Sequence, residues 1–202
     1  MRDSMTRLEA KLFSDPIGAV LYDLVHDALA TQRVKVSEDT EYYLATLLAA
    51  FLRADPERFS RALGVELLKA EDMDRGRRYV KLKEVADTSL FLSGIFLDHL
   101  EAQLPATDYF FEVGSRAYLR LGRSDDRHPL VEPFVDTYLD LGSRFEEFVR
   151  VLSAMADTEL FASNSRVVGL YERWLRSGTP RDTHRLVALG VIPGKPDFGK
   201  TH

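Results

Sequence analysis

Four polar side chains with possible chemical roles interrupt the most apolar stretch of the chain, residues 80–104. They are Asp87, Thr88, Ser89 and Ser93. On a helical wheel Ser89 falls in the middle of the apolar face, with Thr88 and Ser93 beside it. A buried hydroxyl without a partner costs about 1–3 kcal/mol. Two interpretations therefore stay open: the hydroxyls bond to carbonyls of their own helix and let neighbours pack closely, or the four side chains line a ligand pocket.

His99 lies at the edge of the same apolar face and is a further candidate ligand-binding residue. A partly buried imidazole could bind haem or act as a general base, although a histidine in such a position more often only packs. A Ser-His-Asp triad within this one helix is excluded by distance. Ser89 and Ser93 would lie roughly 15 and 9 Å from His99 along the axis. The stretch therefore predicts no catalytic residue.

The sequence lacks the motifs that usually bind metal ions or nucleotides. The chain has no cysteine, so thiolate ligands and disulfides are excluded. Di-iron bundles need Glu-x-x-His pairs, and the chain has none; Asp23 with His26 and Asp125 with His128 only share that spacing. Glycine-rich phosphate loops are also missing. We therefore expect no metal site and no bound cofactor.

A run of cations leads into the apolar stretch: Arg75, Arg77, Arg78 and Lys81. Such a run is usually a solvated face and less often a docking patch for an acidic protein partner. We keep the docking patch as a hypothesis. The whole chain carries a formal charge of −5, which argues against general binding to nucleic acids or to anionic membranes.

The elements that position these residues are all expected to be helices. Residues 80–104 are apolar over most of the helical circumference, so other helices must surround them. Two earlier helices are expected to open at Pro16 and at a Ser37 cap. Between residues 69 and 79 the apolar pattern fades, and we expect an exposed connector there.

After residue 129 a long helix carries apolar residues at alternating spacings of four and three. They are Phe134, Tyr138, Leu141, Phe145, Phe148, Leu152 and Met155. This spacing is typical of a coiled-coil seam. The seam could pack inside the chain's own bundle or against a second copy, and we slightly favour a homodimer. The patterns together predict an all-α, single-domain bundle of about six to eight helices over residues 1–192, followed by a disordered tail over 193–202.

Two segments in the middle of the chain, LKEVADTSLFLSGIF at 82–96 and YFFEVGSRAYLRLG at 109–122, resemble a signature of uncharacterised bacterial all-helical proteins. The resemblance covers about the middle half of the chain. It implies that the two segments, with Gly94, Gly114, Ala117 and Tyr118, form a packed helix pair at the heart of the fold. It implies no catalytic residue.

The expected function rests mainly on the patterns that the sequence lacks. No apolar run approaches the length of a transmembrane helix, and the first residues have no apolar core of signal-peptide length, so we expect a cytoplasmic protein without a membrane partner. The leading interpretation is a non-enzymatic protein that acts through protein–protein contacts, as a regulator or adaptor. The alternative is a bundle that binds a small molecule or cofactor, as a sensor or enzyme, in a pocket beside residues 80–104.

Overall fold

The computed structural model describes residues 16–52, 63–95, 106–123 and 132–156, together with residues 158 and 161. Within these ranges the chain forms seven α-helices and two short 3-10 helices, and no strand. The prediction of an all-α fold is confirmed. His99 and the tail expected at 193–202 lie outside the described residues.

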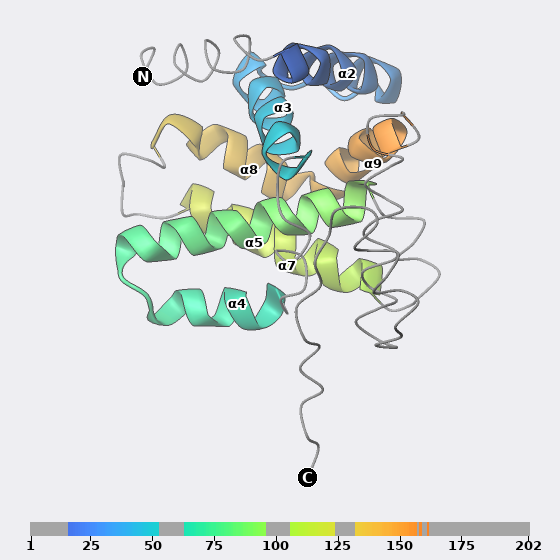
Figure 1. Ribbon diagram of the computed structural model, residues 1–202. Helices are drawn as coiled ribbons and strands as arrows, with labels where there is room; N and C mark the ends of the chain where they lie inside the picture. Colours follow the sequence, from blue (N-terminus) through green and yellow to red (C-terminus); the bar gives the residue numbers. More distant parts are fainter. Residues whose placement is uncertain are drawn as a thin grey trace, which may run out of the picture.

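The helices follow one another along the chain and pack into one bundle (Figure 1). Their bounds are α2 Pro16–Gln32, α3 Glu38–Leu52, α4 Leu63–Lys69, η2 Ala70–Asp72, α5 Arg75–Ile95, α7 Ala106–Arg123, η3 Glu132–Phe134, α8 Val135–Ser143 and α9 Phe145–Ala156. Helix α5 crosses the middle of the molecule and packs most extensively against α7 and α9, while α8 packs against α7. Helices α5 and α7 run antiparallel, so that the start of α5 lies beside the end of α7 (Figure 1).

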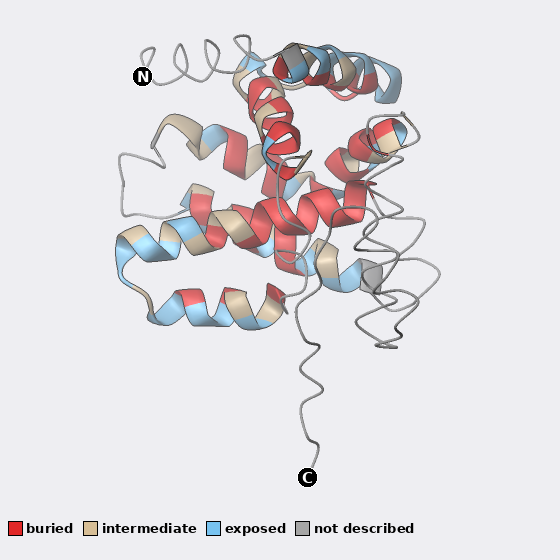
Figure 2. Ribbon diagram, in the orientation of Figure 1, coloured by how far each residue is buried: buried red, intermediate tan, exposed pale blue. Residues whose placement is uncertain are grey.

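Helix α5 is the central helix that the apolar pattern predicted. Every residue from Val85 to Ile95 is buried, and Figure 2 shows this half of the helix in red at the centre of the bundle. The first turns of α5 are largely exposed. A helix that is apolar nearly all round can be stable in water only when other helices cover it on most sides.

The connector expected between residues 69 and 79 is shorter than predicted, because α5 begins at Arg75 rather than near Val80. Asp74 explains the early start. Its carboxylate accepts a hydrogen bond from the backbone N–H of Arg77 at 3.1 Å, and its carbonyl accepts one from the N–H of Arg78 at 2.8 Å. This is the geometry of a helix N-cap, a position that aspartate favours.

Ser37 caps α3 as the sequence predicted, since its hydroxyl accepts the backbone N–H of Thr40 at 3.2 Å. Before that cap, α2 ends at Gln32, and the next residue, Arg33, has a φ of 57°, in the left-handed region. The N–H of Val34 donates to the carbonyl of Leu29 at 3.0 Å, and the N–H of Arg33 donates to the carbonyl of Ala30 at 3.1 Å. These two bonds form a Schellman motif, which turns the chain from α2 into α3.

The long helix expected after residue 129 is broken at Arg144 into α8 and α9. Gly142 lies against Leu119 of α7, where a Cβ would come within 2.9 Å of the backbone nitrogen of that leucine. From Tyr138 to Met155 all the seam residues are buried, and Phe134 is half-buried. The seam is thus filled by the chain's own helices, which is the first of the two possibilities that the spacing left open.

Candidate functional site

The most unusual buried group of the described chain is the carboxylate of Asp87, on α5, which is only 8% exposed. Its Oδ1 accepts hydrogen bonds from the hydroxyl of Tyr43 on α3 at 2.6 Å and from the hydroxyl of Tyr118 on α7 at 2.8 Å. Its Oδ2 pairs with the ammonium of Lys83, one turn earlier on α5. A buried carboxylate is tolerated when donors surround it. Here the donors come from three helices and tie them together.

The ammonium of Lys83 lies at the edge of this cluster. Its side chain is 35% exposed, and the Nζ also lies 4.9 Å from the centre of the Tyr43 ring, within the range of a cation–π contact. Neighbouring helices thus cover part of the Lys83–Asp87 pair. The side chain that carries the positive charge is more exposed than the one that carries the negative charge.

The hydroxyls around Asp87 remain protonated donors at ordinary pH. Burial, followed by the nearby charge of Asp87, raises the pKa of Tyr43 and of Tyr118 well above the usual value. Tyr138 packs edge-on against Tyr43, with ring centres 5.6 Å apart, and shares a hydrogen bond of 3.0 Å with Tyr79. Aromatic rings therefore pack next to the carboxylate.

The buried hydroxyl side chains of α5, on Thr88, Ser89 and Ser93, lie where helices pack closely together. Ser93 donates to the carbonyl of Ser89 at 2.6 Å, within its own helix. Ser89 faces Gly114 of α7, where a Cβ would lie 2.7 Å from the Cβ of Ser89. The hydroxyls of Thr88 and Ser89 have no hydrogen-bond partner among the described residues. A ligand-binding role for these residues, and for Asp87 and His99, stays a prediction.

The predicted basic run lies on the exposed first turns of α5, where Lys81 is held by acidic neighbours. The ammonium of Lys81 lies 2.8 Å from Glu66 of α4 and 3.0 Å from Glu84. Hydrogen bonds from Lys81 and Lys69 lower the pKa of Glu66 from 4.5 to about 2. Arg75, the first residue of α5, is exposed. Lys81 is therefore part of the joint between α4 and α5.

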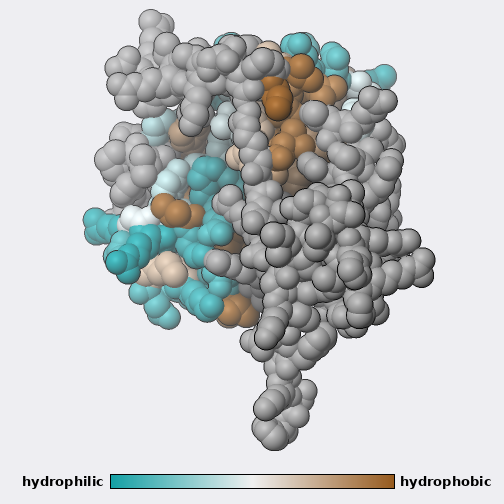
Figure 3. Space-filling model, viewed as in Figure 1, coloured by the Kyte–Doolittle hydropathy of each residue, from teal (hydrophilic) through white to brown (hydrophobic). Residues whose placement is uncertain are grey.

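Two arginines of the same run are also paired within the chain. The guanidinium of Arg77 lies 3.2 Å from the carboxylate of Asp74. That of Arg78 donates to the backbone carbonyls of Glu71 and Met73, both at 3.1 Å. Figure 3 shows a mainly hydrophilic surface over this end of the molecule. Binding of an acidic partner by the run stays a prediction.

A groove that the sequence did not predict lies between α7 and the joint of α8 and α9, with a volume of about 730 Å³. We call it the α7–α9 groove. The described residues that line it are Asp108, Phe111, Glu112, Ser115, Gly142, Ser143, Arg144, Phe145, Glu146, Glu147 and Arg150. The rings of Phe111 and Phe145 meet edge-on within it, with centres 5.9 Å apart. The pair Gly142-Ser143, inside an otherwise helical pattern, was the sequence signal for the break that opens the groove.

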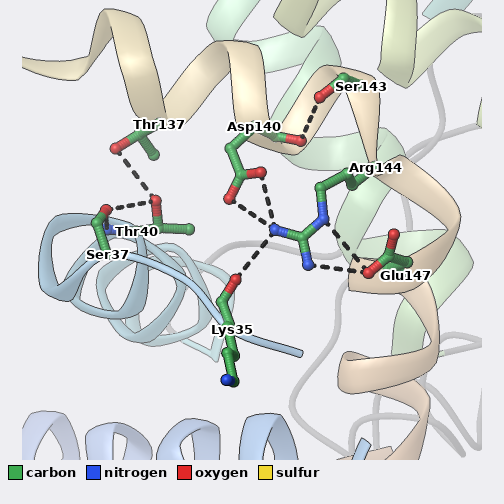
Figure 4. Close-up of polar contacts among 8 residues, drawn as sticks. All are labelled: Lys35, Ser37, Thr40, Thr137, Asp140, Ser143, Arg144 and Glu147. Atoms are coloured by element: carbon green, nitrogen blue, oxygen red, sulfur yellow. Dashed lines mark hydrogen bonds and ion pairs between the residues drawn. The ribbon is translucent and has the colours of Figure 1, made fainter. Parts of the chain in front are cut away.

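Arg144 forms one wall of the α7–α9 groove and is held from several sides (Figure 4). Its guanidinium donates to Asp140 at 2.9 Å, to Glu147 at 2.9 Å and to the carbonyl of Lys35 at 3.1 Å. The hydrogen bond to Glu147, and then that to Asp140, raise the pKa of Arg144, while the bond from Arg144 lowers the pKa of Glu147. The bond to Lys35 connects this wall with the turn between α2 and α3.

The other acidic residues of the α7–α9 groove differ in how they are paired. Glu112 forms an ion pair of 2.6 Å with Arg116. Asp108 and Glu146 are exposed and have no ion-pair partner among the described residues. Counted over the lining residues, four acidic and two basic side chains leave the groove with a formal charge of −2. The groove thus combines two aromatic rings with two carboxylates that are unpaired within the part of the chain that the structure describes.

Comparisons with protein-family models, with curated proteins and with solved structures find no match to this chain. Within the described ranges, no group of three or more histidine, aspartate or glutamate side chains is placed to hold a metal ion. Among the described helices, none has the length and apolar character needed to cross a membrane. A proposal for the function therefore depends on the geometry of the Asp87 cluster and of the α7–α9 groove.

Proposed function

We propose that this protein acts by contact with another protein, as a non-enzymatic regulator or adaptor of the cytoplasm, and that the partner binds in the α7–α9 groove. The observation that carries the proposal is the contrast between two polar regions. The polar groups around Asp87 are directed at one another inside the bundle, whereas Asp108 and Glu146 line a groove and are unpaired among the described residues. Unpaired charges beside aromatic rings are features of protein-binding surfaces.

The occupant that suits this groove is an amphipathic, basic helix of the partner. Apolar side chains of such a helix would cover the half-buried ring of Phe111, which packs on the buried Phe145, and its lysines or arginines would meet Asp108 and Glu146. A helix laid into a groove between helices is a common mode of peptide recognition. The groove volume of about 730 Å³ provides room for several side chains. The rigid wall at Arg144 would cost little ordering entropy on binding, because its guanidinium is already held by Asp140 and Glu147.

A defined peptide tests the proposal directly. The probe is a fluorescein-labelled 14-residue peptide of leucine and lysine at helical spacing, and its counterpart carries glutamate in place of lysine. Fluorescence anisotropy at physiological salt should show saturable binding of the lysine peptide in about the micromolar range. The double variant Asp108→Lys/Glu146→Lys should weaken that binding by about tenfold or more, because two attractive charges become repulsive.

The matched control changes the same charge on a different face. Asp23→Lys/Asp27→Lys alters two exposed aspartates of α2 by the same four units of charge and should leave the affinity within about twofold. Equal weakening by both double variants would show only general attraction between opposite charges and would overturn the proposal. The proposal would also be overturned if the glutamate peptide bound as tightly as the lysine peptide.

A second copy of the chain is the competing occupant of the groove. The seam from Tyr138 to Met155 is buried and offers no surface for pairing, so a homodimer would have to use another face. Light scattering at two concentrations tenfold apart measures the mass directly. If the protein is a dimer and the double variant Asp108→Lys/Glu146→Lys dissociates it, the partner in the groove is a second copy of the chain and not a different protein.

The small-molecule alternative has its own test. It would need space beside α5 near Ser89 and Ser93, where Gly114 and the ring of Phe145 pack closely. Native mass spectrometry of the purified protein, with an absorbance scan, would detect a retained ligand or cofactor. A stoichiometric extra mass that Ser89→Leu removes would favour this alternative over protein binding.

A further inference from the structure

A second, smaller pocket of about 280 Å³ lies between η2, α5 and α7, apart from the α7–α9 groove. The described residues that line it are Ala70, Glu71, Arg78, Leu82 and Arg120. Ala70 and Leu82 are buried and apolar. The antiparallel packing of α5 and α7 brings Arg78 and Arg120 to the same pocket, although 42 positions separate them in the sequence. The pocket therefore combines two guanidinium groups with an apolar patch.

The guanidinium of Arg78 is fixed in position by the backbone. One terminal nitrogen donates to the carbonyls of both Glu71 and Met73, at 3.1 Å each. An arginine has five N–H donors, so several remain for another acceptor. A charged donor held in place before a ligand arrives loses less entropy when it binds.

Arg120 already holds a carboxylate. Its guanidinium lies 2.6 Å from the carboxylate of Glu71, and both side chains are about half exposed. Ion pairs at such exposure are weak, so an incoming carboxylate can take the place of Glu71 at small cost. The side chain of Glu71 thus shows which chemical group Arg120 accepts and competes with an external one.

The charge of the pocket limits what it can bind. Two arginines and one glutamate leave a formal charge of +1 on a chain whose total is −5. One negative charge balances this pocket, whereas a phosphate dianion would exceed it. Ala70 is fully buried and Leu82 is 6% exposed, so the apolar wall of the pocket is small and suits only a short aliphatic body. The volume of about 280 Å³ lies just below the usual range for small-ligand sites.

We propose that this pocket binds a single carboxylate on a short apolar body, with Arg120 as the main binding residue, Arg78 as its oriented second donor and Glu71 as an internal competitor. The inference is independent of partner binding in the α7–α9 groove. Two sources offer this chemistry: a small free organic acid, or the C-terminal residue of another protein.

The test follows binding of butyrate to the full chain by two-dimensional NMR titration of the backbone amides, with an independent measurement by calorimetry. We expect saturable binding in about the millimolar range. Arg120→Gln should weaken it by about tenfold or more, because the main charged donor is lost. Glu71→Gln should strengthen it by about two- to fivefold, the factor that a surface ion pair is worth. A strengthening variant cannot be explained by damage to the fold.

Arg116→Gln is the matched control. Arg116 lies one turn from Arg120 on the same helix, pairs with Glu112 at 2.6 Å, and does not line the pocket. It should leave butyrate affinity within about twofold. Circular dichroism of each variant checks that the helical content is kept. Equal weakening by Arg116→Gln and Arg120→Gln would overturn the site, and so would unchanged or weaker binding by Glu71→Gln.

Three further ligands decide the chemistry and its source. Inorganic phosphate that binds as tightly as butyrate would overturn the single-carboxylate assignment. A six-residue peptide ending in leucine, with a free C-terminal carboxylate or with an amide, separates the two sources. If only the free-carboxylate peptide binds, and binds more tightly than butyrate, the natural ligand is a protein C-terminus. If that peptide binds more weakly than butyrate, the natural ligand is a small organic acid. The proposal would be overturned if the Glu71→Gln variant bound neither butyrate nor the free-carboxylate peptide in a saturable way.

Discussion

The hydroxyl of Tyr43 donates a hydrogen bond of 2.6 Å to the carboxylate of Asp87, although 44 positions of sequence separate the two residues. The same oxygen accepts the hydroxyl of Tyr118 from a third helix. This buried acceptor is the point where α3, α5 and α7 are joined by polar bonds. Its contribution to stability can be measured.

Asp87→Ala should lower the free energy of unfolding by about 3–5 kcal/mol, because the mutation leaves two buried hydroxyls and the Lys83 ammonium without their acceptor. Urea unfolding followed by circular dichroism measures the loss. The double variant with Lys83→Met should recover part of it, since the unpaired charge is then gone. Asp136→Ala, at an exposed position of α8, is the control and should change stability by less than about 0.5 kcal/mol. A loss below 1 kcal/mol for Asp87→Ala would show that the cluster does not stabilise the fold.

The ion pair between Glu66 and Lys81 should make stability depend on acid pH. Because folding lowers the pKa of Glu66 from 4.5 to about 2, its ionised form stabilises the fold above pH 4.5, and this contribution is lost as the pH falls from 4.5 towards 2. Glu66→Gln should therefore cost about 1–2 kcal/mol at pH 7, less than the full linkage value because water screens the pair. Urea unfolding at pH 7 and near pH 2 should show the difference between wild type and variant shrinking with acid. A difference that stays constant with pH would contradict the assignment.

Gly94→Ala should destabilise the protein by about 1–3 kcal/mol, even though alanine is the better helix former. A Cβ at Gly94 would overlap the Cβ of Leu152 on α9, which cannot turn away because it is attached to the backbone. Gly76→Ala, in the first turn of the same helix and only half-buried, should instead stabilise by up to about 1 kcal/mol. Thermal unfolding of the two variants compares them directly. A stabilising Gly94→Ala would mean that α5 and α9 are not in close contact there.

Thr88→Val should leave the free energy of unfolding within about 0.5 kcal/mol of the wild-type value, or raise it. The buried hydroxyl of Thr88 has no hydrogen-bond partner among the described residues, and valine has the same shape. Ser93→Ala, by contrast, removes the bond to the Ser89 carbonyl and should cost about 1 kcal/mol. Urea unfolding of both variants measures the contrast. A loss of 2 kcal/mol or more at Thr88 would reveal a partner for its hydroxyl.

Much of the helical architecture could be predicted from local patterns. The apolar circumference of α5 and the cap at Ser37 depend on residues close in sequence, and the structure agrees with both. Helix ends were less predictable. The early start of α5 depends on one cap at Asp74, and the break at Arg144 follows directly on the close approach of Gly142 to Leu119.

The candidate sites show the limit of the sequence most clearly. By itself the sequence determined that the chain is all-α, that its central helix must be covered by others, and that four polar side chains, Asp87 among them, interrupt that helix, because helical period and hydrophobicity are local properties. Only the tertiary structure decided that tyrosines from α3 and α7 reach Asp87, that Arg78 and Arg120 share a pocket, and that the α7–α9 groove exists. These depend on how helices cross, and crossing is set by side-chain packing between segments far apart in the chain.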